Sequence, residues 1–148
     1  MDRLPADLVL SVEDNPAEAD VEALPTGLEA FNEQQWPGHQ PWETLGVFIR
    51  RGGTVVAGLA GESYAGWFFI RYFWIDAPLR RQGLGRRLIA AAEQRARERG
   101  CHGAFLDTFS FQAPEFYRRQ GYEEFARLPY LPKGERIFLR KSLQPFGT

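Results

Sequence analysis

The sequence is poor in cysteine, histidine and lysine, and it contains no long apolar run. The single cysteine, Cys101, can form neither an internal disulfide nor a multi-cysteine zinc site, so a reducing compartment such as the cytosol is expected. The longest apolar stretch, residues 64–70, is far shorter than the roughly 20 residues that span a bilayer. Residues 1–14 carry acidic side chains and only a short apolar run, which excludes a signal peptide from our expectations.

The length and the amino-acid composition of the chain fit one globular domain. The chain has 148 residues, of which 44% are hydrophobic and 25% charged, so we expect a single domain over residues 1–148 with a loose tail at about 144–148. Residues 1–79 contain 12 acidic and 4 basic residues, whereas residues 80–148 contain 7 acidic and 14 basic ones. A basic half suggests an anionic ligand, but the total charge of -1 argues against nucleic acid.

Hydrophobic spacing and turn residues predict an order of strands and helices. Pro25 and Gly27 are expected to divide the first helical segment into two short helices. The last two strands are expected to pair antiparallel. The predicted elements are a strand at 8–12, two helices within 17–35, three strands in meander order at 45–50, 55–60 and 67–75, a helix from 84 to about 99, a strand at 104–109, a short helix at 114–120, and strands at 123–128 and 136–143.

The segment at 80–87, RRQGLGRR, lies between a predicted strand and a predicted helix. Gly83 and Gly85 let the backbone approach a ligand closely, and the first amides of the helix point outward at the positive end of the helix dipole. Four arginines add fixed charge, although arginine at a helix start is unfavourable unless an anion offsets it. The segment therefore predicts a phosphate site. A solvated basic turn is the alternative, and the spacing matches neither a P-loop nor a dinucleotide fingerprint.

The sequence RRQGLG resembles the R/Q-x-x-G-x-G/A pyrophosphate loop of the GNAT-fold N-acetyltransferase superfamily. As in that family, it follows a strand, FWID, and precedes a long helix. A second block, AFLDTFSFQAPEFYRRQGY, is similar to the family's strand, short helix and F-Y-x-x-x-G-[FY] segment. The resemblance covers nearly the whole chain, although the N-terminal third matches only in outline. It implies an α/β (α+β) fold with a mixed, mostly antiparallel sheet of six to seven strands and about four flanking helices.

The resemblance also implies an activity and a set of binding residues. The chain is expected to bind acetyl coenzyme A and to transfer its acetyl group to an amine of a small molecule or a protein, by direct attack in a ternary complex. No metal, membrane or nucleic-acid partner is implied. Because members of this family often form dimers, a homodimer is one expected oligomeric state. The residues that the resemblance assigns to the pyrophosphate and the pantetheine arm are Phe73, Trp74, Ile75, Arg80, Arg81, Gln82, Gly83, Leu84, Gly85 and Arg86.

Tyr117 falls on the family's usual tyrosine, so the resemblance implies that its hydroxyl protonates the leaving thiolate. Pro114 and Glu115 suit the start of a short helix, and Gly121 suits its end. Successive helical residues point about 100° apart, so the ring of Phe116 or of Tyr117 is expected to enter the core while the other reaches the cleft. A tyrosine that only packs on the core is the alternative.

No clear general base is visible in the sequence. The strand at 67–75 carries Arg71 and Tyr72 but no glutamate, which departs from family members that place one there. This absence keeps a second hypothesis open, in which the protein is a noncatalytic regulatory module that binds acyl coenzyme A. A catalytic role also stays open without a base, because an amine that arrives in its neutral form does not need to be deprotonated before it attacks. The other acid or base candidates, each more simply explained as a turn, cap or solvated residue, are Asp76, Asp107, Glu43 and His39.

The acidic N-terminal third bears on the acceptor. Residues 1–43 contain ten carboxylates and one basic residue, and the resemblance places this region beside the acceptor, so a cationic amine is expected. Phe31, Trp36 and Trp42 are expected to form an aromatic wall there, with buried aromatics on a solvated helix as the alternative. The sequence does not distinguish between a polyamine, an amino acid, an aminoglycoside-like amine and a protein amine as the acceptor. A donor with a longer acyl group than acetyl is a further alternative.

Overall fold

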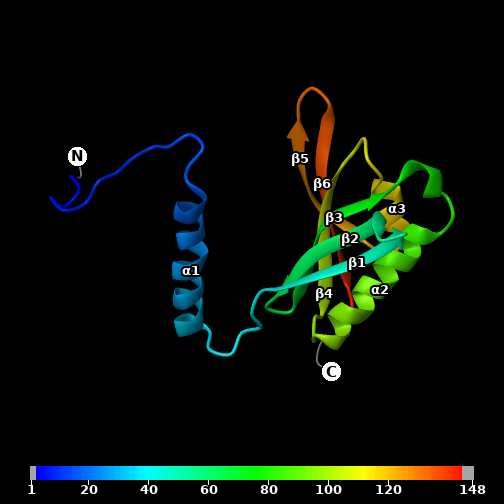
Figure 1. Ribbon diagram of the computed structural model, residues 1–148, viewed down its shortest axis with the longest axis horizontal. Helices are drawn as coiled ribbons and strands as arrows, with labels where there is room; N and C mark the ends of the chain where they lie inside the picture. The colour runs from blue at the N-terminus through cyan, green and yellow to red at the C-terminus, as the bar shows by residue number, and fades with distance from the viewer. Residues whose placement is uncertain (1–2, 145–148) are drawn as a thin grey trace. The chain divides into compact units, whose positions relative to one another are not determined.

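The computed structural model describes residues 3–144, which form two compact units, residues 3–39 and residues 40–144 (Figure 1). Of the tail expected at 144–148, all but the first residue lies outside the described part. Within residues 3–144, no helix is both long and apolar enough to cross a membrane. The elements are α1 Glu18–Gln35, β1 Glu43–Arg51, β2 Thr54–Tyr64, β3 Trp67–Ile75, the 3-10 helix η1 Ala77–Leu79, α2 Leu84–Glu98, β4 Gly103–Phe109, α3 Pro114–Arg119, β5 Glu123–Tyr130 and β6 Gly134–Ser142.

The first unit contains one helix, α1, where the sequence predicts two. Pro25 lies inside α1 and does not divide it. The missing N–H of a proline removes one hydrogen bond, and the remaining bonds of an 18-residue helix keep it continuous. The prediction of about four helices is therefore slightly wrong, because the described residues contain three α-helices and η1.

The predicted strand at residues 8–12 is wrong. The chain has no regular secondary structure there, and Val9 and Val12 are 91% and 92% exposed. Alternating side chains favour an extended backbone, but a strand also needs a hydrogen-bonded neighbour. Residues 8–12 have no such neighbour within residues 3–144, so a local pattern alone does not make a strand here.

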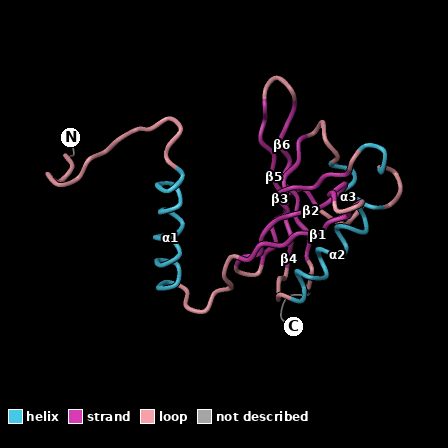
Figure 2. The backbone as a smooth tube through the Cα atoms, viewed as in Figure 1, coloured by secondary structure: helices cyan, strands magenta, loops and turns pink. Residues whose placement is uncertain are grey.

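The second unit is built on a mixed sheet of six strands in the order β1-β2-β3-β4-β6-β5 (Figures 1 and 2). The predicted meander of β1, β2 and β3 and the antiparallel pairing of β5 with β6 are confirmed. Strand β4 lies parallel to β3 and antiparallel to β6. The chain from β3 to β4 runs through α2, as a parallel crossover requires. The predicted α/β class with a mostly antiparallel sheet is therefore confirmed.

Helix α2 covers one face of β1, β2 and β3. Ile89 and Ala92 are buried on the face that packs against Leu59 and Ile70 of the sheet, as the helical spacing of the apolar residues predicts. A buried carboxylate on the same helix is fully satisfied. Glu93 accepts hydrogen bonds from the Tyr122 hydroxyl at 2.8 Å and from the Lys141 ammonium at 2.9 Å, which joins α2 to the segment before β5 and to β6.

Two irregularities in the sheet shape the centre of the unit. The register of β2 and β3 shifts between Ala60 and Gly61, so that Arg71 is the extra residue of a bulge. A Cβ atom at Gly61 would collide with the backbone of β3, so the bulge needs glycine there. On its other side, β3 pairs with β4 only as far as Ile70 and Leu106. Beyond that pair the two parallel strands separate and leave a cleft between them.

Candidate active site

The loop before α2 has the backbone of an anion site. Arg81 and Gly83 both adopt left-handed conformations, with φ of 64° and 78°. This conformation is open to glycine but costs a residue with a side chain about 1–2 kcal/mol. Gly83 is the N-cap of α2 and offers no capping side chain, so the first amides of the helix are available to a ligand. Left-handed residues beside a helix start are typical of backbone nests that bind anions.

A cavity of about 810 Å³ lies in front of this loop, between the end of β3, the start of α2 and α3. Its lining contains four arginines and no carboxylate, so its electrostatic character is cationic. Gln82 does not line it; instead its side-chain amide donates a hydrogen bond to the Pro78 carbonyl at 3.2 Å. The residues expected from the sequence that do line the cavity are Phe73, Trp74, Ile75, Arg80, Arg81, Gly83, Leu84, Gly85, Arg86 and Tyr117.

Sequence reasoning missed the part of this cavity that comes from the segment after β4. Phe111 and Arg119 line it, and only tertiary structure brings them opposite the loop. Phe116 also lines it. Tyr117 packs against the core, as expected for one of the two rings, but it lines the cavity as well, so the expected division of the two rings between core and cleft is confirmed only in part. A Cβ atom at Gly85 would stand 3.0 Å from the Phe116 ring, so glycine allows this close packing of α2 on α3.

The cleft between β3 and β4 holds a second cavity of about 170 Å³. Tyr117 lines both this cavity and the larger one, and therefore stands where they meet. Its ring packs edge-on against Phe73 at a centroid distance of 6.0 Å. Burial, assisted by the negative charge of Asp107, raises the pKa of the Tyr117 phenol to about 12. The phenol is therefore a proton donor throughout the neutral range.

Asp107 lines the small cavity but is held by a cation. Its Oδ1 accepts a hydrogen bond from Nε of Arg136 at 2.9 Å, and this contact raises the pKa of Arg136. Arg136 also donates to the Tyr130 hydroxyl at 3.2 Å. Because the carboxylate already accepts a hydrogen bond from the Arg136 guanidinium, the geometry favours a structural and electrostatic contribution from Asp107 over general-base catalysis.

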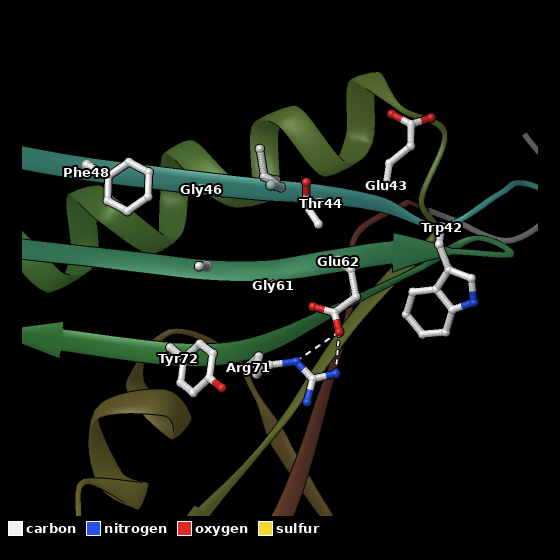
Figure 3. A pocket seen from close by; sticks show the side chains of 11 residues that line it. Trp42, Glu43, Thr44, Gly46, Phe48, Gly61, Glu62, Arg71 and Tyr72 are labelled. Carbon is white, nitrogen blue, oxygen red and sulfur yellow. Dashed lines mark hydrogen bonds and ion pairs between the residues drawn. The ribbon is translucent and has the colours of Figure 1, made fainter. Parts of the chain in front are cut away.

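A third cavity, which we call the outer groove, lies on the face of β1, β2 and β3 opposite α2 (Figure 3). Its volume is about 640 Å³, and its floor is made of small residues, including Gly46 and Ala60. Glu62 points into it and is paired with Arg71, whose Nε donates to Oε1 of Glu62 at 2.9 Å. Sequence reasoning missed Glu62 because it places the end of this strand at residue 60. The structure extends β2 to Tyr64 and brings a carboxylate onto the central sheet.

The aromatic residues expected around the acceptor are distributed over both units. Trp42 lines the outer groove and stacks on Tyr64 with a centroid distance of 4.7 Å. Phe31 and Trp36 belong to the unit of residues 3–39, where their side chains are 56% and 58% exposed. Of the three, Trp42 is the one that lines a cavity described above.

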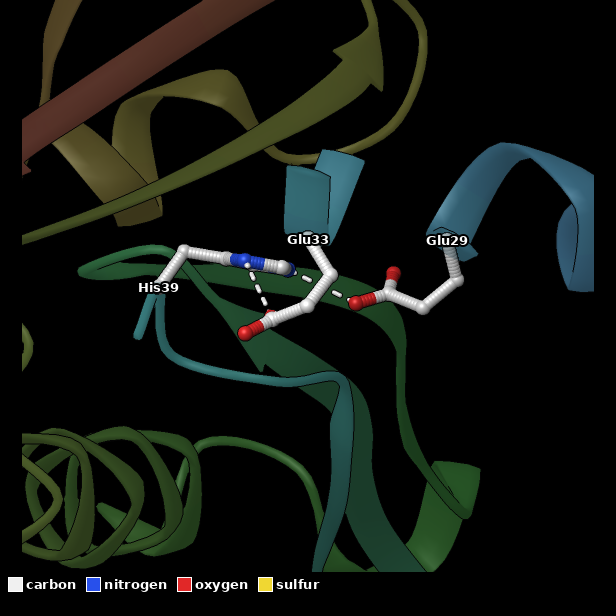
Figure 4. A group of neighbouring side chains, drawn as sticks. All are labelled: Glu29, Glu33 and His39. Atoms are coloured by element: carbon white, nitrogen blue, oxygen red, sulfur yellow. Dashed lines mark hydrogen bonds and ion pairs between the residues drawn. The ribbon is translucent and has the colours of Figure 1, made fainter. Parts of the chain in front are cut away.

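His39 forms a charged cluster at the end of α1 (Figure 4). Its Nδ1 lies 2.9 Å from the Trp36 carbonyl oxygen, to which it can only donate, and its Nε2 lies 2.7 Å from Oε1 of Glu29. Glu33 approaches Nδ1 at 3.3 Å. The ligand atoms of the three side chains lie within 4.8 Å of one another, so the group could also hold a metal ion. A doubly protonated imidazolium explains these contacts without one, and the expected absence of a metal stays a prediction.

We expect His39 to titrate above its ordinary pKa of 6.5, because the Trp36 carbonyl and the Glu29 carboxylate both favour the protonated ring. A raised folded-state pKa stabilises the protein fully below the unfolded value, and this contribution is lost as the pH rises through the folded value. An NMR titration of the ring, in protein treated with a chelator, measures the shift. In a Glu29→Gln variant the midpoint should fall toward 6.5; an unchanged midpoint would show that Glu29 is not its partner.

The comparisons with known proteins agree with this geometry. The sequence profile described as the acetyltransferase (GNAT) family matches residues 11–122. A blasticidin-S acetyltransferase of Streptomyces morookaense is 47% identical over 83 residues, which cover 55% of this chain and 61% of that protein. This chain thus matches less than two thirds of that relative's length. An acetyltransferase of Agrobacterium fabrum is 33% identical over 123 residues, which cover 82% of this chain and 89% of that protein.

Solved structures show the same fold. A crystal structure from Agrobacterium tumefaciens, described as a proposed acetyltransferase, has a TM-score of 0.84 at 29% identity and covers 91% of this chain and 99% of that one. A Bacillus anthracis structure, described as a proposed streptothricin acetyltransferase in complex with acetyl coenzyme A, has a TM-score of 0.58 at 20% identity and covers 67% of this chain and 62% of that one. At that identity the likeness concerns the fold alone.

The basic loop, the cleft beside it and the family match support one assignment. The relatives are named as acetyltransferases, so the alternative of a noncatalytic binding module is not favoured. The loop that resembles the pyrophosphate motif lies within the matched residues, and it lines the largest of the described cavities. The chain therefore belongs to the acetyltransferase (GNAT) family of enzymes.

Proposed function

We propose that this chain transfers an acetyl group from acetyl coenzyme A to the amine of a small molecule, by direct attack in a ternary complex. The observation that carries the proposal is the position of Tyr117, which lines both the cationic cavity and the cleft between β3 and β4. A thioester that extends from the first cavity into the second would bring its sulfur close to a phenol that stays protonated. This arrangement supports a leaving thiolate better than it supports simple storage of a ligand.

The large cavity suits coenzyme A in its cationic lining and in its volume of about 810 Å³. The backbone amides around Gly83 and the side chains of Arg80, Arg81 and Arg86 are the groups that would hold its pyrophosphate, because charge-assisted hydrogen bonds to phosphate are strong. Apolar side chains of β3 and α3 would line the pantetheine arm. Coenzyme A supplies the acyl thioester, and the protein supplies orientation and a proton.

The chemistry requires the acceptor nitrogen to lose two protons and the departing sulfur to gain one. The acceptor ammonium loses one proton to water, and the neutral nitrogen then attacks the thioester carbonyl while the carbon–sulfur bond breaks. The nitrogen loses its second proton to water as the amide forms, and the departing sulfur takes a proton from the Tyr117 hydroxyl, which solvent restores. A backbone amide of β3 beyond Ile70, where β3 no longer pairs with β4, would stabilise the carbonyl oxygen as negative charge develops.

The outer groove is the proposed acceptor site. It meets the cleft at Arg71, which lines both cavities, so an amine bound in the groove has a route toward the thioester. The groove is about 640 Å³, which suits a small molecule better than a protein chain. The blasticidin-S acetyltransferase among the relatives supports a small-molecule acceptor.

Release of free thiol from acetyl coenzyme A tests the proposed function. The protein is incubated with acetyl coenzyme A and a panel of small amines, and thiol is measured against a reaction without amine. We expect amine-dependent release and an acetylated product of the corresponding mass. Tight binding of acetyl coenzyme A with no amine-dependent thiol from any member of a broad panel would contradict the proposal and favour a binding module.

A further inference from the structure

The ion pair in the outer groove lies at an irregular point of the sheet. Arg71 is the extra residue of the bulge in β3, and bulges commonly redirect a side chain beside an active site. As a result, Arg71 and the next residue, Tyr72, are both exposed and both line the groove. The Arg71 guanidinium lies 5.0 Å from the centre of the Phe69 ring, which supports it from one side. The bulge therefore presents a cation and an aromatic ring on the same face.

Glu62 completes the polar part of the groove. Both Nε and Nη2 of Arg71 contact its Oε1, and the Glu62 side chain is only 15% exposed whereas that of Arg71 is 47% exposed. Figure 3 shows the pair beside the small-residue floor of the groove. One carboxylate and one guanidinium thus face the same space with balanced charge. A second carboxylate at the rim, Glu43, lies 3.6 Å from Arg99 and is also paired.

Balanced charge decides which amines this groove suits. Both contacts of Arg71 use Oε1 of Glu62, so an acceptor with positive charge alone could pair with Oε2, but it would then stand beside the Arg71 guanidinium as a like charge that nothing on the acceptor offsets. An acceptor that carries both an ammonium and a carboxylate avoids this penalty. Its ammonium pairs with Glu62 while its carboxylate pairs with Arg71, whose planar guanidinium matches a carboxylate with two hydrogen bonds.

The apolar lining of the groove adds a second requirement. Trp42, Phe48 and Tyr72 stand around a floor that includes Gly46 and Ala60. The Phe48 ring lies on Gly46, where a Cβ atom would stand 2.6 Å from it. The small side chain of Ala60 leaves space beside the aromatic rings for a flat group, and aromatic pairs gain energy beyond simple burial. A small aliphatic amine would leave this surface in contact with water. The shape therefore favours a planar group attached to the charged part of the acceptor.

We propose that the outer groove selects a zwitterionic aromatic amine, and that the Glu62–Arg71 pair opens to hold its ammonium and its carboxylate. The inference rests on the proposed acetyl transfer, because the bound amine is the acceptor in that reaction. Binding of the amine to the groove can nevertheless be measured without turnover. Arg71 and Glu62 are positioning residues in this scheme. They select and orient the acceptor at the junction between the groove and the cleft.

The test uses acceptors that differ in one group at a time. Thiol release is measured at saturating acetyl coenzyme A with tryptophan, with tryptamine, which lacks the carboxylate, with alanine, which lacks the ring, and with putrescine, which is purely cationic. We expect kcat/KM for tryptophan to exceed that for tryptamine by about 10- to 100-fold, the usual value of a charged hydrogen-bonded contact. Putrescine or tryptamine as the better acceptor would overturn the inference while supporting acetyl transfer.

Variants separate selection from general damage. In Arg71→Gln the ratio of kcat/KM for tryptophan to kcat/KM for tryptamine should fall to near one, whereas Arg71→Lys should keep part of this preference. Glu62→Gln should lower kcat/KM for both acceptors. Arg140→Gln, on β6, removes an equal charge elsewhere on the sheet and should preserve the preference. A preference that survives Arg71→Gln overturns the inference.

A binding measurement distinguishes failure of this inference from failure of the proposed function. Calorimetry with tryptophan, without acetyl coenzyme A, should show binding that Arg71→Gln weakens by a similar factor. Such binding with no turnover of any amine would support the groove and overturn the proposed function. Absence of both binding and turnover with tryptophan, when another amine is acetylated, would overturn only the inference.

Discussion

Replacing Arg81 and Arg86 together by alanine should weaken binding of coenzyme A by about 100-fold or more, because each removes one charged contact to phosphate. Both side chains line the cationic cavity, at the left-handed turn and on the first turn of α2. The backbone amides at Gly83 stay in place, so some affinity should remain. Isothermal calorimetry at two salt concentrations measures the loss, which should shrink at high salt because the phosphate contacts are partly exposed.

The control for this pair removes the same amount of charge from α2, outside the cavity. Arg87 and Arg95 do not line the cavity, and Arg95 pairs with Glu98 on the exposed side of α2. An Arg87→Ala, Arg95→Ala double variant should therefore bind coenzyme A nearly as well as the unaltered protein. Equal loss in both double variants would show that overall charge, and not the loop, attracts the ligand.

The predicted parts of the site are those that local sequence determines. Gly83 and Gly85 stand between a strongly β-forming segment and an amphipathic helix, and each pattern is visible without tertiary information. The cavity wall supplied by Phe111 and Arg119 is different. These residues face the loop only because α3 packs on α2, a contact between segments far apart in the chain.

Glu62 illustrates a second limit of local patterns. The alternation of small and apolar residues in β2 weakens after Ala60, so the sequence predicts that the strand ends before the charged residue Glu62. The pairing of β2 with both neighbours carries the strand on to Tyr64. The bulge opposite Gly61 then places Glu62 and Arg71 on one face, which neither residue's own neighbours in the sequence reveal.

The two wrong predictions in the N-terminal unit also come from reading local sequence alone, but here the local pattern predicts a strand and a helix break that the structure does not contain. Residues 8–12 have a strand-like pattern but no partner strand, and the local signal therefore predicts too much. Pro25 is a strong local breaker, yet the surrounding residues of α1 keep the helix continuous. Local sequence sets a preference in each case, and the pairing or cooperativity of the neighbouring residues decides the outcome.

Replacing Tyr117 by phenylalanine should lower kcat for acetyl transfer by about 100-fold, the usual contribution of a positioned general acid. The ring and its contact with Phe73 are kept, so the affinity for coenzyme A should stay within about twofold. Only the hydroxyl that would protonate the thiolate is lost. Single-turnover thiol release measures the chemical step, and calorimetry measures binding of the same variant.

The pH dependence gives an independent test of the same hydroxyl. Burial raises the pKa of Tyr117 to about 12, so the phenol remains in its proton-donating form across the range in which the enzyme can be assayed. Ionisation of Tyr117 should therefore cause no loss of kcat up to about pH 10. Tyr130→Phe is the matched control, since Tyr130 lines none of the three cavities and its hydroxyl accepts a hydrogen bond from Arg136. Unchanged thiol release in Tyr117→Phe would mean that water protonates the thiolate and that Tyr117 only packs.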